Sequence, residues 1–468
     1  MVLLALDKRT MYNKNDFQHC ISIFMLKRIV KIAVVVFVCL LLYKGSMFLV
    51  DKLYLPAESS ISKEDSIAAM AVEWPQWHGP NRDNRSAENG LLKSWPDKGP
   101  RLFWKCDGLG KGWSSPTLAG GHIYVTGVED EKEFLTCLNP RDLSKWTIFY
   151  GSASKMYSGA RSSPTFNDGY IYVISGTGEV ICIDVKKQMI EWKINGYRIF
   201  SGKCHHFGTA ESPLVFDGKV FYTPCGQRTT MVALDKRTGE TIWESESLDD
   251  LSSYVSPIII RRGTQDIIVT VTGMYIIGVN PKTGEFVWKY PYVENHRTKA
   301  KVNTLIQNAV TPLYHDGQLY VTSGYDHVGI ALKLSEQGEK ISLLWEDETL
   351  DCHHGGVILH NSYIYGSNWH NNLNGNWVCL DWRTGQVIYD HKWFGKGSIL
   401  YADGMLYCYE ERQGNIALVK PAPGGFEIVS SFQITKGTGE HWAHPVICNG
   451  RLYIRRGDSL MAYDVKQK

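Results

Sequence analysis

The sequence predicts an all-β fold, an eight-bladed β-propeller whose blades are four-stranded antiparallel sheets. Three observations lead to this prediction. A ten-residue phrase recurs along the chain, a tight-turn signal returns at a regular spacing, and the composition is rich in glycine (44), tyrosine (25) and tryptophan (15). Self-similarity at a fixed period marks repeat architectures, and this composition suits a turn-rich protein with much aromatic surface to bury.

The recurring phrase reads as the end of one strand, a tight turn and the start of the next strand. Its copies run from Leu234 to Trp243, from Val279 to Trp288 and from Leu380 to Tyr389, and a decayed copy without the glycine runs from Ile183 to Trp192. Asp235 and Gly239 are the turn residues of the first copy, because aspartate can bond its own backbone two residues on and glycine accepts a positive φ. The residues after the turn, Ile242 and Trp243, suit a packed strand.

A second phrase precedes these copies and allows the blades to be counted. It is a small residue and proline, a short apolar run, Asp-Gly or Asn-Gly, and an alternating strand, and it recurs eight times with variations. Its eight copies begin near residues 115, 163, 212, 256, 311, 355, 397 and 444. Pro116 and Pro445 are 329 residues apart, which divides into seven steps of 47 residues. Asp-Gly between alternating runs predicts a type I′ hairpin, and a repeat of this length predicts four short strands.

The two ends of the propeller are predicted to meet in the last blade. The eighth unit ends without an aromatic fourth strand, whereas residues 100–105, with Trp104, supply one ahead of the first blade. An N-terminal strand that completes the last blade would remove two open sheet edges, which otherwise invite aggregation. A seven-bladed ring with an extra sheet is the alternative. One aromatic residue per blade is expected to pack between neighbouring sheets: Trp104, Trp192, Trp243, Trp288, Trp345, Tyr389 and Phe432.

The N-terminal region predicts a membrane anchor. A basic flank, residues 27–31, precedes twelve uninterrupted apolar residues, 32–43, and no small-x-small cleavage site directly follows. We therefore expect a cytoplasmic tail or extended start at 1–28 (Met25 is a second possible start), a signal-anchor transmembrane helix at 29–50, a linker at 51–73 and the propeller at 74–468. A cleaved signal peptide is the alternative. The positive-inside rule places the propeller outside the cytoplasm, on the periplasmic side, with the N-terminus cytoplasmic.

Charge and cysteine content exclude several classes of protein. The net charge is +2, so a basic footprint for nucleic acid is missing. Nine of the eleven cysteines follow the apolar segment, an odd number without any CxxC pair, which argues against a complete disulfide framework and against common zinc or haem motifs. We expect cysteines in apolar runs to be small core residues: Cys182, Cys225, Cys379, Cys408 and Cys448.

The phrase Asp-x-x-Thr-Gly-x-x-x-Trp, together with Ser-Pro and an Asp-Gly hairpin, resembles the pyrroloquinoline-quinone (PQQ) repeat family. Its eight-bladed members include quinoprotein alcohol dehydrogenases and the non-enzymatic outer-membrane assembly lipoprotein. The stretch Trp74–Asp83 is similar to the start of an exported bacterial subgroup of PQQ-like propellers. The resemblance implies the fold over residues 74–468.

The resemblance leaves two functions open. The first is a non-catalytic binding or scaffold module of the cell envelope, whose partner is an envelope protein or a small polar ligand such as a sugar. The second is a quinoprotein dehydrogenase that oxidises an alcohol or sugar with PQQ and Ca²⁺. Enzymes of the family carry adjacent cysteines near the cofactor and a Glu, Asn and Asp set around calcium. This chain has no Cys-Cys pair, and no matching set aligns with it. The first function, without a cofactor, is therefore favoured.

Three loops that lead into innermost strands are rich in histidine. They contain His205 and His206, His353 and His354, and His441 and His444. Neutral imidazoles beside Cys204 or Cys352 would suit zinc or copper, if the loops converge. The alternative is that these side chains line a wet channel, because their blades lie far apart around the ring.

Four further residues are candidates for binding a ligand at the channel mouth. Trp113 and Arg161 occupy equivalent loops, and the arginine would clamp an anion or form a hydrogen bond between blades. Asn368 and Trp369 begin a hairpin rich in amides and tryptophan, a composition that suits sugar recognition. The alternative to a sugar-binding role is that this hairpin is only an extended loop, in which asparagine tolerates a left-handed backbone.

Overall fold

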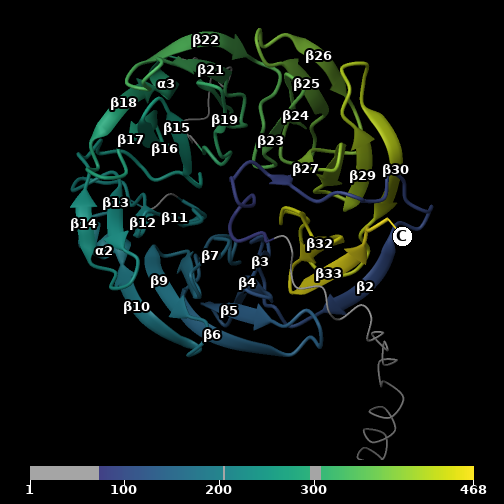
Figure 1. Cartoon of the computed structure of the whole chain (residues 1–468), viewed down its shortest axis with the longest axis horizontal. Coiled ribbons are helices and arrows are strands. Elements are labelled where there is room, and N and C mark those ends of the chain that lie inside the picture. Colours follow the sequence, from purple (N-terminus) through teal and green to yellow (C-terminus); the bar gives the residue numbers. More distant parts are fainter. Residues whose placement is uncertain (1–72, 204–205, 296–306, 468) are drawn as a thin grey trace, which may run out of the picture. The chain divides into compact units, whose positions relative to one another are not determined.

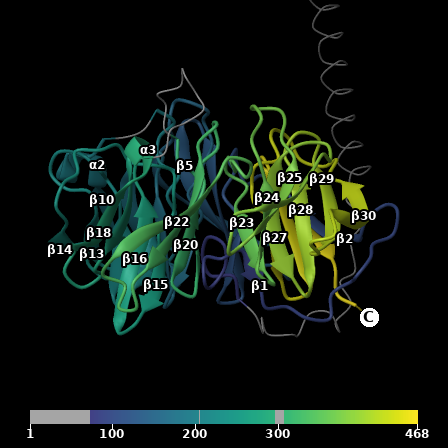
Figure 2. The same ribbon diagram turned by 90° about the horizontal axis from the view of Figure 1, so that it is seen from above.

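Eight antiparallel sheets form a ring in the computed structural model (Figure 1). The structure describes residues 73–203, 206–295 and 307–467. The predicted tail and anchor, and nearly all of the predicted linker, lie outside these ranges. Among the described residues, no helix is long and apolar enough to cross a membrane. Figure 2 views the ring edge-on, with the strands running across its thickness.

The first four blades follow one another around the ring, each from the innermost strand outward. Blade 1 comprises β3 (Thr117–Ala119), β4 (His122–Glu129), β5 (Lys132–Leu138) and β6 (Lys145–Ser152). Blade 2 comprises β7 (Thr165–Asn167), β8 (Tyr170–Ile174), β9 (Glu179–Asp184) and β10 (Met189–Asn195). Blade 3 comprises β11 (Leu214–Phe216), β12 (Lys219–Tyr222), β13 (Val232–Asp235) and β14 (Thr241–Glu244). Blade 4 comprises β15 (Ile258–Arg262), β16 (Gln265–Val271), β17 (Tyr275–Val279) and β18 (Phe286–Pro291).

The remaining blades complete the ring. Blade 5 comprises β19 (Leu313–His315), β20 (Gln318–Val321), β21 (Gly329–Leu334) and β22 (Ile341–Asp347). Blade 6 comprises β23 (Val357–His360), β24 (Tyr363–Ser367), β25 (Trp377–Asp381) and β26 (Val387–His391). Blade 7 comprises β27 (Gly397–Ala402), β28 (Met405–Glu410), β29 (Asn415–Lys420) and β30 (Glu427–Gln433). Blade 8 comprises β31 (Val446–Cys448), β32 (Arg451–Arg456), β33 (Ser459–Asp464) and β2 (Arg101–Cys106).

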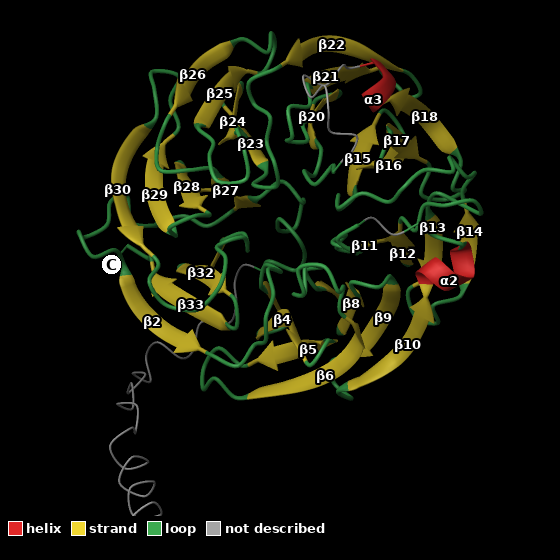
Figure 3. Cartoon of the chain, turned by 180° about the vertical axis from the view of Figure 1, so that it is seen from behind, coloured by secondary structure: helices red, strands yellow, loops and turns green. Residues whose placement is uncertain are grey.

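The predicted ring closure is confirmed. The N-terminal strand β2 pairs antiparallel with β33, so the two ends of the propeller share blade 8 and the seven-bladed alternative is excluded. One strand was not foreseen: β1 (Arg85–Ser86) pairs parallel with β27 and gives blade 7 a fifth strand on its inner side. Two short helices, α2 (Gly196–Phe200) and α3 (Tyr292–Asn295), follow the outer strands of blades 2 and 4 (Figure 3).

The turn chemistry follows the prediction from sequence. Oδ1 of Asp235 accepts hydrogen bonds from the backbone nitrogens of Arg237 and Thr238 at 2.7 and 2.9 Å, and Gly239 has a φ of 74°. The hairpins that join the first and second strands of most blades have positive φ at both central residues, such as 47° and 75° at Asp217 and Gly218. This is the type I′ geometry, whose twist matches that of the strands.

The recurrent tryptophans of blades 2, 3 and 5 each pack on the turn glycine of the next blade. Trp243 of blade 3 packs on Gly284, the turn glycine of blade 4, and its Nε1 donates to the carbonyl of Pro281 at 3.1 Å. Trp192 repeats the contact on Gly239 of the following blade. A glycine is needed there because any Cβ would occupy the space of the indole ring. The tryptophan of one repeat and the glycine of the next therefore form a single packing contact, and each residue is required for it.

A segment at the N-terminus of the propeller fills the centre of the ring. We call residues 74–86 the central segment, and Figure 1 shows it in purple inside the ring. Arg82 is 3% exposed and donates to the carbonyls of Ser212 and Pro213 in blade 3 and of Pro257 in blade 4. Burial lowers the pKa of Arg82 to about 9, so its guanidinium is protonated at neutral pH.

The central segment also bonds with the other six blades. Its partners are Leu118 (to Trp74), Phe166 (to Pro75), Thr311 (to Trp77), Leu359 (to Arg85), Ile399 (to Asn84) and Ile447 (to Ser86). Five of these six groups are backbone groups on innermost strands, which would lack partners at the centre of a ring. The segment thus satisfies polar groups of all eight blades at once.

Gly284→Ala tests the contact between blades. The new methyl group would meet the Trp243 ring in a backbone conformation with a φ of 79°, so we expect a loss of about 2–4 kcal/mol in the free energy of unfolding. Gly218→Ala is the matched control, because its φ is 75° and no atom lies within 4 Å of the added Cβ. It should cost only about 1 kcal/mol. Urea denaturation measures both, and equal costs would show that the tryptophan contact contributes nothing.

Candidate functional site

One face of the ring carries a connected set of aromatic side chains. We call this side of the ring the loop face, because the loops that lead into the innermost strands lie there. Nine rings form what we call the aromatic belt: Trp113, Tyr157, Phe207, Tyr254, Tyr325, His353, His354, Trp369 and Trp442. Neighbouring centroids in the belt lie 4.6–6.5 Å apart, within the range of favourable aromatic pairs. Loops far apart in sequence therefore meet on this face.

Trp442 is the hub of the belt. Its ring centroid lies 5.1 Å from that of Trp113, 6.1 Å from that of His354 and 6.5 Å from that of Tyr157. These partners precede blades 1, 6 and 2, whereas Trp442 precedes blade 8. Trp442 is partly exposed and Tyr157 is 57% exposed, so the belt presents ring surface to solvent.

Trp113 and Arg161, the candidates from equivalent loops, lie in contact with each other. The Arg161 guanidinium lies 5.1 Å from the Trp113 ring centroid, and Trp113 Nε1 donates to Glu440 at 3.1 Å. Arg161 also donates to the carbonyls of Met156 and Tyr157, at 3.0 and 2.6 Å. These bonds lie within its own loop, so Arg161 holds in place the backbone of the most exposed belt residue.

The candidate metal ligands are only partly brought together. His354 and His444 meet through a hydrogen bond, from His444 Nε2 to the carbonyl of His354 at 2.9 Å. His353 instead bonds with Tyr325, and His441 with Tyr409, at 2.8 and 2.6 Å. His206 is exposed beside Phe207, and His205 lies outside the described residues. Within the ranges that the structure describes, no three His, Cys, Asp or Glu side chains are placed to hold a metal ion.

A buried polar chain connects the belt with the central segment. His444 Nε2 must donate, since its partner is a carbonyl, so in neutral His444 Nδ1 accepts and His78 Nε2 is the donor across 2.9 Å. Burial lowers the pKa of His444 to about 3, and that of His78 well below its ordinary value, which keeps both rings neutral. Trp77 stacks on His78 with centroids 4.0 Å apart. Trp77 and His78 of the central segment therefore support the loop that carries His444 and Trp442.

The same region contains a buried ion pair. Glu411 binds the ammonium of Lys396, which is 2% exposed, and lies 3.0 Å from His354 Nε2. Burial lowers the pKa of Lys396 to about 8 and that of His354 to about 3. His354 is thus a neutral ring that donates to a carboxylate, and its position in the belt is fixed from below.

The described cysteine and acidic side chains bear on the quinone alternative. The eight cysteines that the structure describes are free and buried, and Cys352, at the loop face, donates its thiol to the carbonyl of Gly356. In the described part of the chain no acidic set converges as a metal cage. The five cysteines expected in the core are buried, although Cys225 lies in the β12–β13 loop, with a φ of 46°, rather than in a strand.

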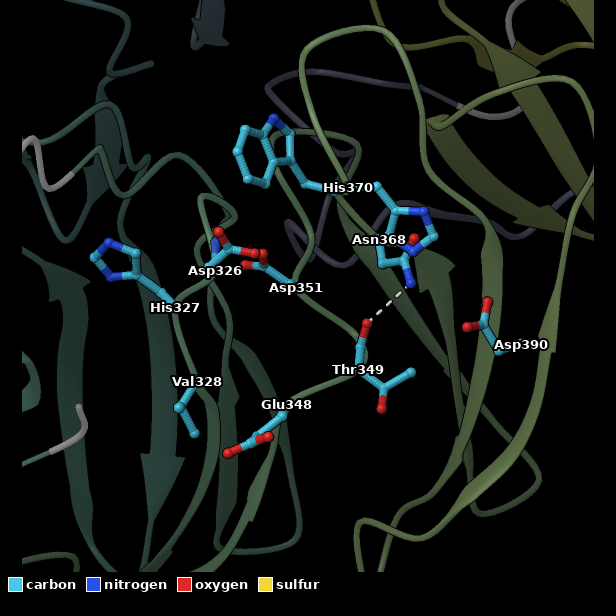
Figure 4. A pocket seen from close by; sticks show the side chains of 10 residues that line it. Asp326, His327, Val328, Glu348, Thr349, Asp351, Asn368, His370 and Asp390 are labelled. Carbon is cyan, nitrogen blue, oxygen red and sulfur yellow. Dashed lines mark hydrogen bonds between the residues drawn. The ribbon is translucent and has the colours of Figure 1, made fainter. Parts of the chain in front are cut away.

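Asn368 and Trp369 lie in a separate cavity between blades 5 and 6 (Figure 4). The Asn368 amide is already used, because Nδ2 donates to the carbonyl of Thr349 at 3.0 Å and Oδ1 accepts from the Asn376 nitrogen at 2.7 Å. Trp369 packs on Tyr325 at 5.0 Å and so belongs to the belt as well. The cavity has an acidic lining that the sequence did not indicate.

The comparisons with known proteins agree with the fold. A family model described as "Outer membrane protein assembly factor BamB" matches residues 131–391. Quinoprotein ethanol dehydrogenase of Pseudomonas aeruginosa is 24% identical over 188 residues, which cover 36% of this chain and 29% of that enzyme. The corresponding enzyme of Pseudomonas putida is 24% identical over 200 residues, 39% of this chain and 32% of the enzyme. The matched part therefore spans about a third or less of these relatives.

Among solved structures, BamB from Moraxella catarrhalis has a similar fold. It aligns with a TM-score of 0.58 at 13% sequence identity, and the alignment covers 78% of this chain and 99% of that protein. At this identity the likeness concerns the fold alone.

Glu133, a buried carboxyl group near Arg161, gives a pH-dependent prediction. It is 1% exposed and accepts from the Tyr150 hydroxyl and the Gly176 nitrogen at 2.7 and 2.9 Å, and burial raises its pKa to about 7. Between about pH 4.5 and 7 the folded state therefore binds more protons than the unfolded state, so stability falls as the pH rises across this range and levels off above it. Glu133→Gln should remove about 3 kcal/mol of this dependence.

Thermal or urea unfolding between pH 4 and 9 would measure the slope for the wild type, for Glu133→Gln and for Glu129→Gln, an exposed glutamate of the same blade. An unchanged slope in Glu133→Gln would contradict the assignment.

Proposed function

This chain belongs to the PQQ-like propeller family described as outer membrane protein assembly factor BamB, and from that premise we propose that it is a non-catalytic binding module of the cell envelope. It holds an envelope protein against the aromatic belt. A small polar ligand such as a sugar is the alternative occupant of the belt.

The belt is the observation that carries this proposal. Aromatic side chains are enriched at protein interfaces, where they bury large areas at a low cost in conformational entropy. Here nine rings are gathered from loops around the ring, and Trp442 touches three of them. The central segment occupies the middle of the ring, so the belt is supported from below rather than surrounding an open channel.

The N-terminal sequence completes the proposal. A signal-anchor helix at residues 29–50 would tether the propeller to the membrane, with the tail 1–28 in the cytoplasm and residues 74–468 on the periplasmic side. The basic residues 27–31 on the flank of the apolar run support this orientation. A tethered propeller would act close to the membrane on proteins that pass through or fold in the envelope.

Photocrosslinking from the loop face tests the proposal. A p-benzoylphenylalanine residue at Tyr157 in the full chain, expressed in its native cells, should form an adduct with an envelope protein. The same residue at Ile242, which is 46% exposed on β14, is the matched control and should form none. Trp442→Ala in the Tyr157 background should weaken the adduct at least about fivefold, because the belt loses its hub.

Two results would contradict the proposal. Identical adducts from both positions, or none from Tyr157, would remove the belt as a protein-binding surface. A stoichiometric quinone absorption band after incubation of the purified chain with PQQ and Ca²⁺ would instead favour the dehydrogenase, and dye-linked oxidation of alcohols and sugars would then test its activity.

A further inference from the structure

The cavity between blades 5 and 6 has the dimensions of a small-molecule site. Its volume is about 370 Å³, and it lies among the β20–β21, β22–β23 and β24–β25 loops and the end of β26. Binding sites for small molecules occupy cavities from about 300 Å³ upward. This cavity lies beside the belt but has a different chemical lining.

The lining is strongly acidic. Asp326, Glu348, Asp351 and Asp390 all contribute carboxylates (Figure 4). Among the described residues, Asp326, Asp351 and Asp390 form no ion pair with a lysine or arginine. Like charges gathered in a partly enclosed space repel one another, so the cavity favours a cation.

Asp351 shows where the cation would bind. The residue is 5% exposed, and its Oδ2 accepts from the backbone nitrogen of Asp326 at 2.6 Å. Its Oδ1 is buried and has no hydrogen-bond partner in the part of the chain that the structure describes. A buried carboxylate oxygen without a donor is costly, and a bound donor would remove that cost. Burial raises the pKa of Asp351 to about 7, and the neighbouring Asp326 charge adds to the shift.

The geometry favours an organic cation over a metal ion. No three acidic, histidine or cysteine side chains of the described residues are placed to coordinate one metal ion. The cavity does contain Trp369, whose ring packs on Tyr325 and whose Nε1 donates to Asn372 at 3.2 Å. An indole held in this way offers its face to an ammonium group or to the carbon atoms beside it.

We propose that this cavity binds an organic ammonium ion, whose nitrogen donates to Asp351 and Asp326 while its carbon skeleton lies against Trp369. The ligand class comprises free polyamines and amino sugars, which share a primary ammonium group on a polar or flexible skeleton. The site shares Trp369 with the belt, but its acidic residues lie outside the belt, and the proposal does not require the protein partner.

Isothermal titration of the full chain in detergent tests the proposal, with spermidine and glucosamine as probes and N-acetylglucosamine as the uncharged control. At least one ammonium probe should bind, whereas the acetylated sugar should not, because it lacks the cation. Binding of spermidine would identify the ligand class as polyamines, and binding of glucosamine would identify it as amino sugars.

Three variants complete the test. Asp351→Asn and the more exposed Asp326→Asn should each weaken binding about tenfold or more, because each removes a charge that faces the ligand. Asp316→Asn, on the β19–β20 hairpin of the same blade, is the matched control and should change affinity less than about twofold, because this exposed carboxylate does not line the cavity. Binding of neither ammonium probe, equal binding of N-acetylglucosamine, or unchanged affinity in both Asp351→Asn and Asp326→Asn would overturn the proposal.

Discussion

The hydrogen bonds of Arg82 are the interaction on which the structure most depends. One guanidinium joins blades 3 and 4 by donating to three carbonyls that precede their innermost strands. Burial raises the pKa of Glu211, a buried residue of the same region, to about 8, so its carboxyl group is mostly protonated at neutral pH and, once ionised, stabilises the Arg82 charge. Burial of an arginine is tolerated only when its donors are used. Arg82 meets that condition through its bonds to the three carbonyls. The rest of the central segment bonds to the other blades.

The loop face depends on the same segment. His78, four residues before Arg82, holds His444, and His444 in turn holds the carbonyl of His354. The central segment therefore positions, through His444, both the loop that carries Trp442 and the neighbouring belt residue His354. The rim is held differently, by the tryptophans of blades 2, 3 and 5, each on the turn glycine of the next blade. Together the two sets of contacts connect the blades of a ring that carries the aromatic belt on one face.

The sequence was sufficient to predict the ring but not the site. The turn at Asp235 and Gly239 could be predicted from the local chemistry of these two residue types. The number of blades could be predicted from the regular spacing of such turns. The role of Arg82 could not, because its bonds reach residues 130 and 175 positions away and leave no period in the sequence. The histidine loops show the same limit. His354, ahead of blade 6, meets His444, ahead of blade 8, whereas His441 bonds with Tyr409, and their spacing in the sequence does not distinguish the two cases. The dense Trp, Arg and Asn content of residues 74–86 was the available signal.

Hydrogen–deuterium exchange on Arg82→Met would test most directly whether the central segment holds the blades together. We expect faster exchange in β11 and β15, whose flanking carbonyls lose their donor, and in the loop of Trp442 beyond them. Arg101→Met is the control, because its side chain is 62% exposed on β2, and it should exchange like the wild type. Faster exchange confined to residues 74–86, with the innermost strands unchanged, would show that the blades do not depend on the segment.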